Sequence, residues 1–228
     1  MINEIDASSF KHSIEIYEEE FKIILSGITF CYALMINNNV QVPSNDENRI
    51  RDILYLEYLR KDDIRKKANL INYRFDRETS EDESKGRTDI RVLSKNDFEI
   101  HDAYYIIECK RLDNENLKGS SGLNEEYIKN GIMRFVEQQY STYYTVNGMI
   151  GFIVENMDIN NNIDNINYLI KNNYKQVNSI TKLTFIDFIK DFNYSFYSIH
   201  EDIKGKEIKL YHLMFDFSKN TIINKEYL

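Results

Sequence analysis

The sequence predicts a mixed α/β fold, because its apolar residues recur at two different periods. From 10 to 38 they recur at the three- to four-residue spacing of a helix. Over 87–94, 103–112 and 148–156 they form short runs of strand length, bounded by polar or glycine-containing segments. After the first long helix, the predicted order is helix, three strands, helix, strand, helix and hairpin, with no internal repeat.

Local signals place the individual elements. A long helix is expected over 10–38, either continuous or broken near Gly27, and a linker with the single proline follows it. Ser44 or Asp46 can cap the second helix, since either side chain can accept a hydrogen bond from a free backbone amide. The remaining expected elements are a helix over 47–63, strands over 69–78, 87–94 and 103–112, a helix over 125–144, a strand over 148–156, a helix over 163–174 and a hairpin over 195–218 around Gly205.

The composition is that of a soluble protein with one domain spanning 1–228. Hydrophobic residues make up 42% of the 228 residues and charged residues 29%, which is enough apolar material for one core. The N-terminus has no secretory signal pattern and no stretch reaches the ~18 apolar residues of a membrane span, so no membrane partner is expected. Cys31 and Cys109 lie inside apolar runs, which indicates free thiols and a cytoplasmic setting.

The net charge of −8 bears on the function. A protein that coats nucleic acid by charge alone is usually basic, so the acidity counts against that class. An enzyme whose acidic side chains hold metal ions is compatible with it. The sequence has no zinc-type Cys/His spacing, no phosphate-binding glycine loop and no Gly-x-Ser-x-Gly motif, which argues against those common sites.

An unusual charge pair ends the expected strand over 103–112. Because side chains alternate across a strand, Glu108 and Lys110 share one face with apolar residues that precede them. Both faces are apolar up to this point, as in a central strand covered on both sides. If the strand over 87–94 pairs with it, Asp89 can lie beside Glu108, and two carboxylates so close need a nearby positive charge.

Two kinds of positive charge can meet that need, Lys110 or a divalent cation. Mg²⁺ and Mn²⁺ prefer oxygen ligands, and Asp89, Glu108 and the backbone carbonyl of Cys109 would supply three. Lys110 would then orient or help deprotonate an attacking water and neutralise the charge that develops on a phosphate. This is the chemistry of phosphodiester hydrolysis.

A structural ion pair is the competing explanation for Glu108 and Lys110. The same Glu-x-Lys spacing occurs at 20–22 in the first helix and at 207–209 in the tail hairpin. Residues two apart diverge on a helix, and the pair at 207–209 follows Gly205 like an exposed edge. Only Glu108 and Lys110 follow a long apolar run and have a Gly-x-x-Asp strand upstream.

The stretches GRTDIRV and YYIIECKRL together resemble the core of the PD-(D/E)XK nuclease superfamily, whose fold is called restriction-endonuclease-like. The family pattern is an Asp on one strand, followed on the next strand by Glu or Asp, any residue, and Lys. Asp89, Glu108 and Lys110 match this pattern. Thr88 stands where the family usually has Pro.

The resemblance also implies a layout of the chain. Residues 46–156 would form the catalytic core, with the order helix, three strands, helix, strand. An N-terminal helical extension would cover 1–42, and a C-terminal helix and hairpin would cover 157–228. Many members carry an acidic residue on the helix before the strands, where Glu47 is the candidate catalytic residue and Glu57 its rival.

Five residues are candidates for contacting nucleic acid. One branch of the superfamily, associated with recombination helicases, carries Gln-x-x-x-Tyr on the helix after the site, and Gln139 and Tyr143 match that spacing. A packed aromatic face explains the same residues equally well in a Tyr-rich chain. Arg134 can bind a phosphate or pair with an acid, and Lys85 and Arg87 lie just upstream of the motif's first Asp.

The expected function is a Mg²⁺- or Mn²⁺-dependent endonuclease, a hydrolase that cuts phosphodiester bonds in DNA, with a role in bacterial defence on family analogy alone. An RNA nuclease would use the same site, so both substrates stay open. The alternative from another class is a non-catalytic nucleic-acid-binding or assembly subunit that keeps the fold, which the acidic charge favours. A homodimer is expected because two strands need two sites, or else a partner protein that supplies DNA affinity.

Overall fold

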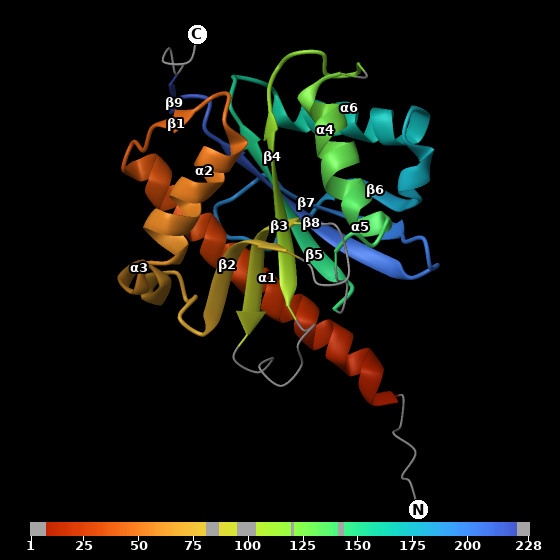
Figure 1. Cartoon of the computed structure of the whole chain (residues 1–228), viewed down its shortest axis with the longest axis horizontal. Helices are drawn as coiled ribbons and strands as arrows, with labels where there is room; N and C mark the ends of the chain where they lie inside the picture. The colour runs from red at the N-terminus through yellow and green to blue at the C-terminus, as the bar shows by residue number, and fades with distance from the viewer. Residues whose placement is uncertain (1–7, 81–86, 95–103, 120, 141–143, 223–228) are drawn as a thin grey trace, which may run out of the picture.

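A seven-stranded sheet with helices on both faces forms the body of the protein, a mixed α/β fold as predicted (Figure 1). This computed structural model describes residues 8–80, 87–94, 104–119, 121–140 and 144–222, except for the side chains of 8–14, 78–80 and 87. The helices are α1 (Ser8–Asn37), α2 (Glu47–Leu54), η1 (Tyr55–Leu59), α3 (Asp62–Lys67), α4 (Leu123–Tyr127), η3 (Ile128–Ile132), α5 (Met133–Val136), α6 (Ile159–Asn172) and η4 (Lys175–Val177). The strands are β1 (Val42–Pro43), β2 (Tyr73–Ser80), β3 (Arg87–Ser94), β4 (Tyr105–Leu112), β5 (Val146–Ile153), β6 (Ser179–Phe185), β7 (Ser195–Glu201), β8 (Glu207–Asp216) and β9 (Thr221–Ile222).

The sheet has the strand order β2-β3-β4-β5-β8-β7-β6. Its two flanks are antiparallel, since β2, β3 and β4 form one meander and β8, β7 and β6 another. The middle is parallel, with β5 between β4 and β8. A parallel pair needs a crossover, and the segment α4–η3–α5 makes the one from β4 to β5. This helical segment therefore returns across the sheet beside the end of β4.

Two hydrophobic cores lie on opposite faces of the sheet. One packs α1, α2 and η1 against side chains that include Tyr105, Ile107 and Cys109 of β4. The other packs α4, α5 and α6 against the opposite face, which includes Ile106 and Leu112 of β4. β4 is therefore an interior strand covered on both faces, as its long apolar run predicts.

α1 runs across the sheet as one unbroken helix of 30 residues (Figure 1). Gly27 does not break it. A Cβ atom at Gly27 would lie 2.6 Å from the carbonyl oxygen of Ala68, so the glycine lets the connection between α3 and β2 lie directly against the helix. Neither α1 nor any other helix in the described ranges is long and apolar enough to cross a membrane.

The helix predicted over 125–144 ends much earlier than expected. The helical segment ends at Val136, and Gln138 has a left-handed φ of 54°. Tertiary contacts hold the end of the helix. The backbone amide of Ile203, in the β7–β8 turn, donates to the carbonyl of Val136, and the Gln138 side chain donates to Asp202. The periodicity of the sequence cannot predict this contact, because Gln138 and Asp202 are 64 residues apart.

The tail hairpin is confirmed as β7 and β8, but it is not an exposed edge. β8 lies between β5 and β7, so the charged residues at 207–209 begin an interior strand, and β6 forms the edge of the sheet instead. The side chain of Asn167 on α6 donates to the carbonyl of Leu183 on β6 and accepts from its amide. These bonds satisfy one residue of an edge strand that the sequence pattern did not predict.

Other boundaries follow the local signals more closely. Asp46 caps α2, with its side chain accepting a 2.9 Å hydrogen bond from the amide of Arg49. The linker over 37–46 contains the short β1, which pairs in parallel with β9. The strand predicted over 69–78 begins only at Tyr73. Both cysteines are buried free thiols, as predicted. The strands predicted over 87–94, 103–112 and 148–156 are confirmed as β3, β4 and β5, and the helix over 163–174 as α6.

A chain of buried hydrogen bonds links α4, β8 and β7. Tyr127 Oη lies 2.8 Å from His212 Nδ1, and His212 Nε2 lies 2.7 Å from Ser198 Oγ. Ser198 Oγ also lies 2.7 Å from His200 Nε2, and His200 Nδ1 lies 3.1 Å from the carbonyl oxygen of Val177. Because a carbonyl only accepts, His200 donates from Nδ1 and Ser198 donates to His200. It follows that His212 donates to Ser198 and Tyr127 donates to His212, so both histidines are satisfied in the neutral form.

This arrangement predicts that acid weakens the fold. Burial lowers the pKa of His200 to about 4 and that of His212 to about 3, from an ordinary value of 6.5. A histidine with a depressed folded pKa stabilises the fold above its unfolded pKa, and this contribution is lost as the pH falls. We expect the free energy of unfolding, measured in urea, to fall between pH 6.5 and 4, by up to roughly 3 kcal/mol for His200 alone.

The variant His200→Gln provides the comparison. Its amide can still donate to Val177 and accept from Ser198, but it does not titrate. The free energy of unfolding of this variant should therefore decline less steeply with acid than that of the wild type. Equal slopes for the two proteins would contradict the assignment of His200 as neutral and buried.

Candidate active site

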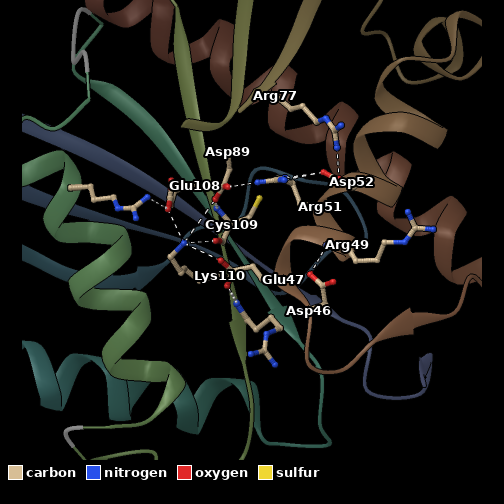
Figure 2. Close-up of polar contacts among 12 residues, drawn as sticks. Asp46, Glu47, Arg49, Arg51, Asp52, Arg77, Asp89, Glu108, Cys109 and Lys110 are labelled. Atoms are coloured by element: carbon tan, nitrogen blue, oxygen red, sulfur yellow. Dashed lines mark hydrogen bonds and ion pairs between the residues drawn. The ribbon is translucent and has the colours of Figure 1, made fainter. Parts of the chain in front are cut away.

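Charged side chains gather at the carboxyl end of β4, between α2 and α5 (Figure 2). Glu108 and Lys110 project from the face of β4 that packs against α4 and α5. Glu108 is fully buried and Lys110 is 7% exposed. The apolar first half of β4 fixes the strand in the core, so the positions of both charged side chains are fixed with it.

Asp89 on β3 lies beside this pair. The register between β3 and β4 runs to Ile90 opposite Ile107, which places Asp89 opposite Glu108 at the next position. At this position a side chain takes part in the pairing of the strands, because Asp89 Oδ2 accepts a 2.8 Å hydrogen bond from the backbone amide of Cys109. A side-chain carboxylate thus joins the two strands at the site, where a backbone carbonyl would ordinarily do so.

Glu47 reaches the same place from α2. It is the first residue of that helix, directly after the cap Asp46, where the helix dipole favours a negative charge. Glu47 Oε2 accepts a 2.7 Å hydrogen bond from the backbone amide of Arg111, and Glu47 Oε1 lies 3.1 Å from Lys110 Nζ. Contacts to both the strand backbone and the lysine therefore hold Glu47 against the end of β4.

The ammonium group of Lys110 lies among three carboxylates (Figure 2). Its Nζ is 2.7 Å from Glu108 Oε1, 3.1 Å from Glu47 Oε1 and 3.9 Å from Asp89 Oδ2. It also donates to the carbonyl oxygen of Cys109 at 2.8 Å. Burial by itself would lower the pKa of Lys110, but attraction to Glu108, Glu47 and Asp89 raises it above its ordinary value. Lys110 is therefore held as a cation at the centre of the cluster.

Three donors surround the carboxylate of Glu108. Besides Lys110, Arg134 Nη1 donates to Oε1 at 2.9 Å, and the hydroxyl of Tyr140 donates to Oε2 at 2.7 Å. Burial, together with repulsion from Asp89, raises the pKa of Glu108 to about 7, although Lys110 and Arg134 act in the opposite direction. Strong perturbation of a carboxyl by burial and by specific neighbours is typical of functional sites.

Arg51 is a residue of this cluster that the sequence pattern did not identify. It lies on α2 one turn after Glu47, its side chain is 3% exposed, and its Nη1 donates to Asp89 Oδ1 at 2.7 Å. Its Nη2 donates to Asp52 at 3.0 Å, and Arg77 on β2 forms an ion pair with the other oxygen of Asp52 (Figure 2). The available signal was an arginine inside the apolar stripe of an amphipathic helix.

Of the residues expected to contact nucleic acid, only Arg134 is seen at the cluster. Lys85 and Tyr143 lie outside the described residues, and so does the side chain of Arg87. Gln139 lies beyond the end of α5 and donates to a neighbouring glutamate, so the prediction that a helix carries it is wrong. The helix ends early because the β7–β8 turn holds its last residues.

Two further side chains after α2 and α5 take definite places. Tyr140, which follows the end of α5, contacts both Glu108 and Arg134. Tyr140 therefore reaches the cluster from the segment that follows α5. Glu57 on η1 is largely exposed and pairs with Lys61 at 3.8 Å. Of the two acids considered on the helix before the strands, Glu47 is the one in contact with the cluster.

The donor atoms suit a hard divalent cation, but their present arrangement does not form a metal site. Asp89, Glu108, Glu47 and the carbonyl of Cys109 are the oxygen ligands that Mg²⁺ and Mn²⁺ prefer. Among the described residues, however, no three Asp, Glu, His or Cys side chains are arranged so that they could hold a metal ion. The ammonium of Lys110 lies in their midst, so a cation could join these oxygens only if Nζ moved aside.

Comparison of the chain with protein-family models found no match. Comparisons with curated proteins and with solved structures found no match either.

The contacts of Arg51 predict a large effect on stability. Arg51→Ala would remove the nearest cation from Asp89, whereas Asp52 would keep Arg77, and breaking a buried ion pair costs roughly 3 kcal/mol or more. We expect urea unfolding to show a loss of about this size. Arg49→Ala is the matched control, since Arg49 is exposed on the same helix, and its effect should stay within about 0.5 kcal/mol. Equal effects of the two substitutions would contradict this role of Arg51.

Proposed function

We propose that the protein is a divalent-metal-dependent endonuclease with a restriction-endonuclease-like core, which hydrolyses phosphodiester bonds in DNA. One observation carries the proposal. Glu47, Asp89 and Glu108 come from three separate elements and converge, with the carbonyl of Cys109, around the position of Lys110 Nζ. Acids that converge on one point at the end of a buried strand are typical of a site that handles a cation and a phosphate.

The order of elements supports the proposed core. α2 is followed by the antiparallel strands β2, β3 and β4, then by the helical segment α4–η3–α5, and then by β5 parallel to β4. This is the order of helix, three strands, helix and strand that the motif resemblance implies. The Asp of the motif lies on β3 and its Glu-x-Lys on β4, and the two strands are paired.

The chain's own groups have separable roles in the proposed reaction. A bound Mg²⁺ or Mn²⁺ would supply Lewis-acid activation of water and of the phosphate. Asp89, Glu108 and the carbonyl of Cys109 would hold it, and Glu47 would hold either the ion or the attacking water. Lys110 would stabilise the negative charge that develops on the phosphate. Its raised pKa supports this role better than removal of a proton from water.

Neighbouring side chains would position these groups. Arg51 fixes one oxygen of Asp89, while Tyr140 and Arg134 each donate to Glu108. The Arg134 side chain is 30% exposed, so it is a candidate contact for a nucleic-acid phosphate. Its contact with Glu108 would then link the bound backbone to the acid that holds the ion.

The choice of DNA over RNA, and a role in bacterial defence, follow from the motif resemblance alone. The net charge of −8 gives the chain little general attraction for nucleic acid. A second copy or a partner protein would therefore contribute to substrate binding.

A second candidate function is a non-catalytic subunit that keeps this fold. The observation in its favour is that the cluster is electrically compensated with no metal ion. Three cations contact three carboxylates, namely Lys110, Arg51 and Arg134 against Glu47, Asp89 and Glu108. Such a network can serve to fix one arrangement of the surrounding elements.

Nicking of supercoiled plasmid tests the proposed activity. The purified protein should nick plasmid when Mg²⁺ or Mn²⁺ is present and stop when a chelator is added. Asp89→Asn and Lys110→Ala should each slow nicking by at least about 100-fold, because each removes a group that acts on the metal or on the developing charge. Glu57→Gln alters an exposed acid outside the cluster and should cut like the wild type. Cutting that persists in both site variants, with circular dichroism unchanged, would sink the proposal.

Calorimetric titration with Mn²⁺ separates the two candidate functions. If the protein is the proposed endonuclease, the wild type should release or absorb heat on binding Mn²⁺. This heat should disappear in Glu108→Ala and remain in Glu57→Gln. Lys110→Ala should bind Mn²⁺ more tightly than the wild type, because it empties the position between the carboxylates. A wild type with no affinity for divalent ions would favour the non-catalytic subunit.

A further inference from the structure

A groove of about 540 Å³ runs along α1, a helix that packs on the face of the sheet opposite Glu108. α1 lines one side of it from Glu19 to Phe30, and residues 67–69 together with Phe188 line the other. A second hollow shares lining residues with the first and continues along α1 to Glu15. The hollow surface therefore follows the helix for about 22 Å, given a rise of ~1.5 Å per residue.

Three large apolar side chains form a row along this surface. Ile16 is 65% exposed, Ile23 is 46% exposed and Phe30 is 38% exposed. They are seven residues apart, a spacing that keeps side chains on one face of a helix over several turns. The buried side of α1 already supplies the core, for example through Phe21 and Ile28. An exposed apolar row that lies along a hollow is a candidate contact surface.

The row is symmetric about its middle residue. A two-fold axis through Ile23 would bring two copies of α1 together in antiparallel orientation. Ile16 of one copy would then lie opposite Phe30 of the other, and the two Ile23 side chains would meet at the axis. An isologous contact requires a surface that is complementary to itself in this way.

One pair of charges along the groove fits the same symmetry, although Glu19 also pairs with Lys22 of its own helix at 2.6 Å. Four residues before Ile23 lies Glu19, whose side chain is 70% exposed, and four residues after it lies Gly27. Gly27 lies against the backbone of Ala68, beside the exposed Lys67. The axis that matches the apolar row therefore brings Glu19 of one copy toward Lys67 of the other, and it does so twice.

We propose that two copies of this chain associate through α1, antiparallel and centred on Ile23. The occupant of the groove is thus the α1 helix of a second copy. The contact is formed by one helix and its flanking residues, so it is of the small size that gives weak, concentration-dependent dimers. It uses none of the residues of the charged cluster and does not depend on the proposed function.

Sedimentation velocity of the full chain tests the association. As the concentration rises from about 1 to about 100 µM, the range in which small interfaces associate, the average mass should move from 27.2 kDa toward twice that value. Ile23→Glu should stay at the monomer mass throughout. Ile180→Glu is the control, because Ile180 is 58% exposed on β6, and it should associate like the wild type.

Two further variants test the antiparallel geometry. Glu19→Lys and Lys67→Glu should each weaken the dimer at least about fivefold, and the double variant should regain most of the loss, as coupled charge pairs do. Under oxidation, Ile23→Cys should form a covalent dimer, because the two residues meet at the axis. The native Cys31 and Cys109 are buried and should not react.

Several results would overturn the proposal. A wild type that stays monomeric over the whole range would show that no second copy occupies the groove. Equal behaviour of Ile23→Glu and Ile180→Glu would place the contact elsewhere. A double charge variant that dimerises more weakly than either single variant would exclude the antiparallel pairing. Circular dichroism of each variant shows whether its fold is retained.

Discussion

The site at the end of β4 depends on one constraint, which is that the carboxylate of Glu108 is buried where water cannot compensate its charge. Lys110 lies two residues later on the same face and supplies the nearest positive charge. Because Lys110 is itself buried between strand and helix, one carboxylate does not suffice, and Glu47 and Asp89 complete its surroundings. Each buried charge in the cluster is therefore compensated by a neighbouring group of opposite charge.

The surrounding fold extends this chain of compensation. Arg51 balances Asp89 from α2, and Asp52 and Arg77 continue the network to β2. On the other side, the end of the helical segment at Val136 leaves the following residues free of helical geometry, and Tyr140 reaches Glu108 from there. The β7–β8 turn holds that helix end, so a distant hairpin contributes to the geometry of the site.

The protein buries polar groups in two different ways. The chain from Tyr127 through His212 and Ser198 to His200 is neutral, and each of its hydrogen bonds has one possible direction. The cluster around Lys110 contains a buried cation, and attraction to the neighbouring carboxyl groups holds it there in addition to hydrogen bonds. A neutral chain needs only partners of the right geometry, whereas an ionised cluster can rearrange when another charge arrives. This difference is why the cluster, and not the histidine chain, is the candidate for chemistry.

Local sequence patterns were enough to predict β3, β4 and β5 and the common face of Glu108 and Lys110, because the alternation of side chains along a strand is a local property. They also indicated Asp89, through the predicted strand order. Glu47 was suggested only by the resemblance to the nuclease superfamily, with Glu57 as its rival. Local patterns did not predict the end of the helix at Val136, the edge strand β6 or the contacts of Arg51 and Tyr140, which arise from tertiary packing. These features depend on contacts between residues far apart in the chain. Such contacts leave no trace in a local sequence pattern, and they form only when the sheet and both helical layers pack together.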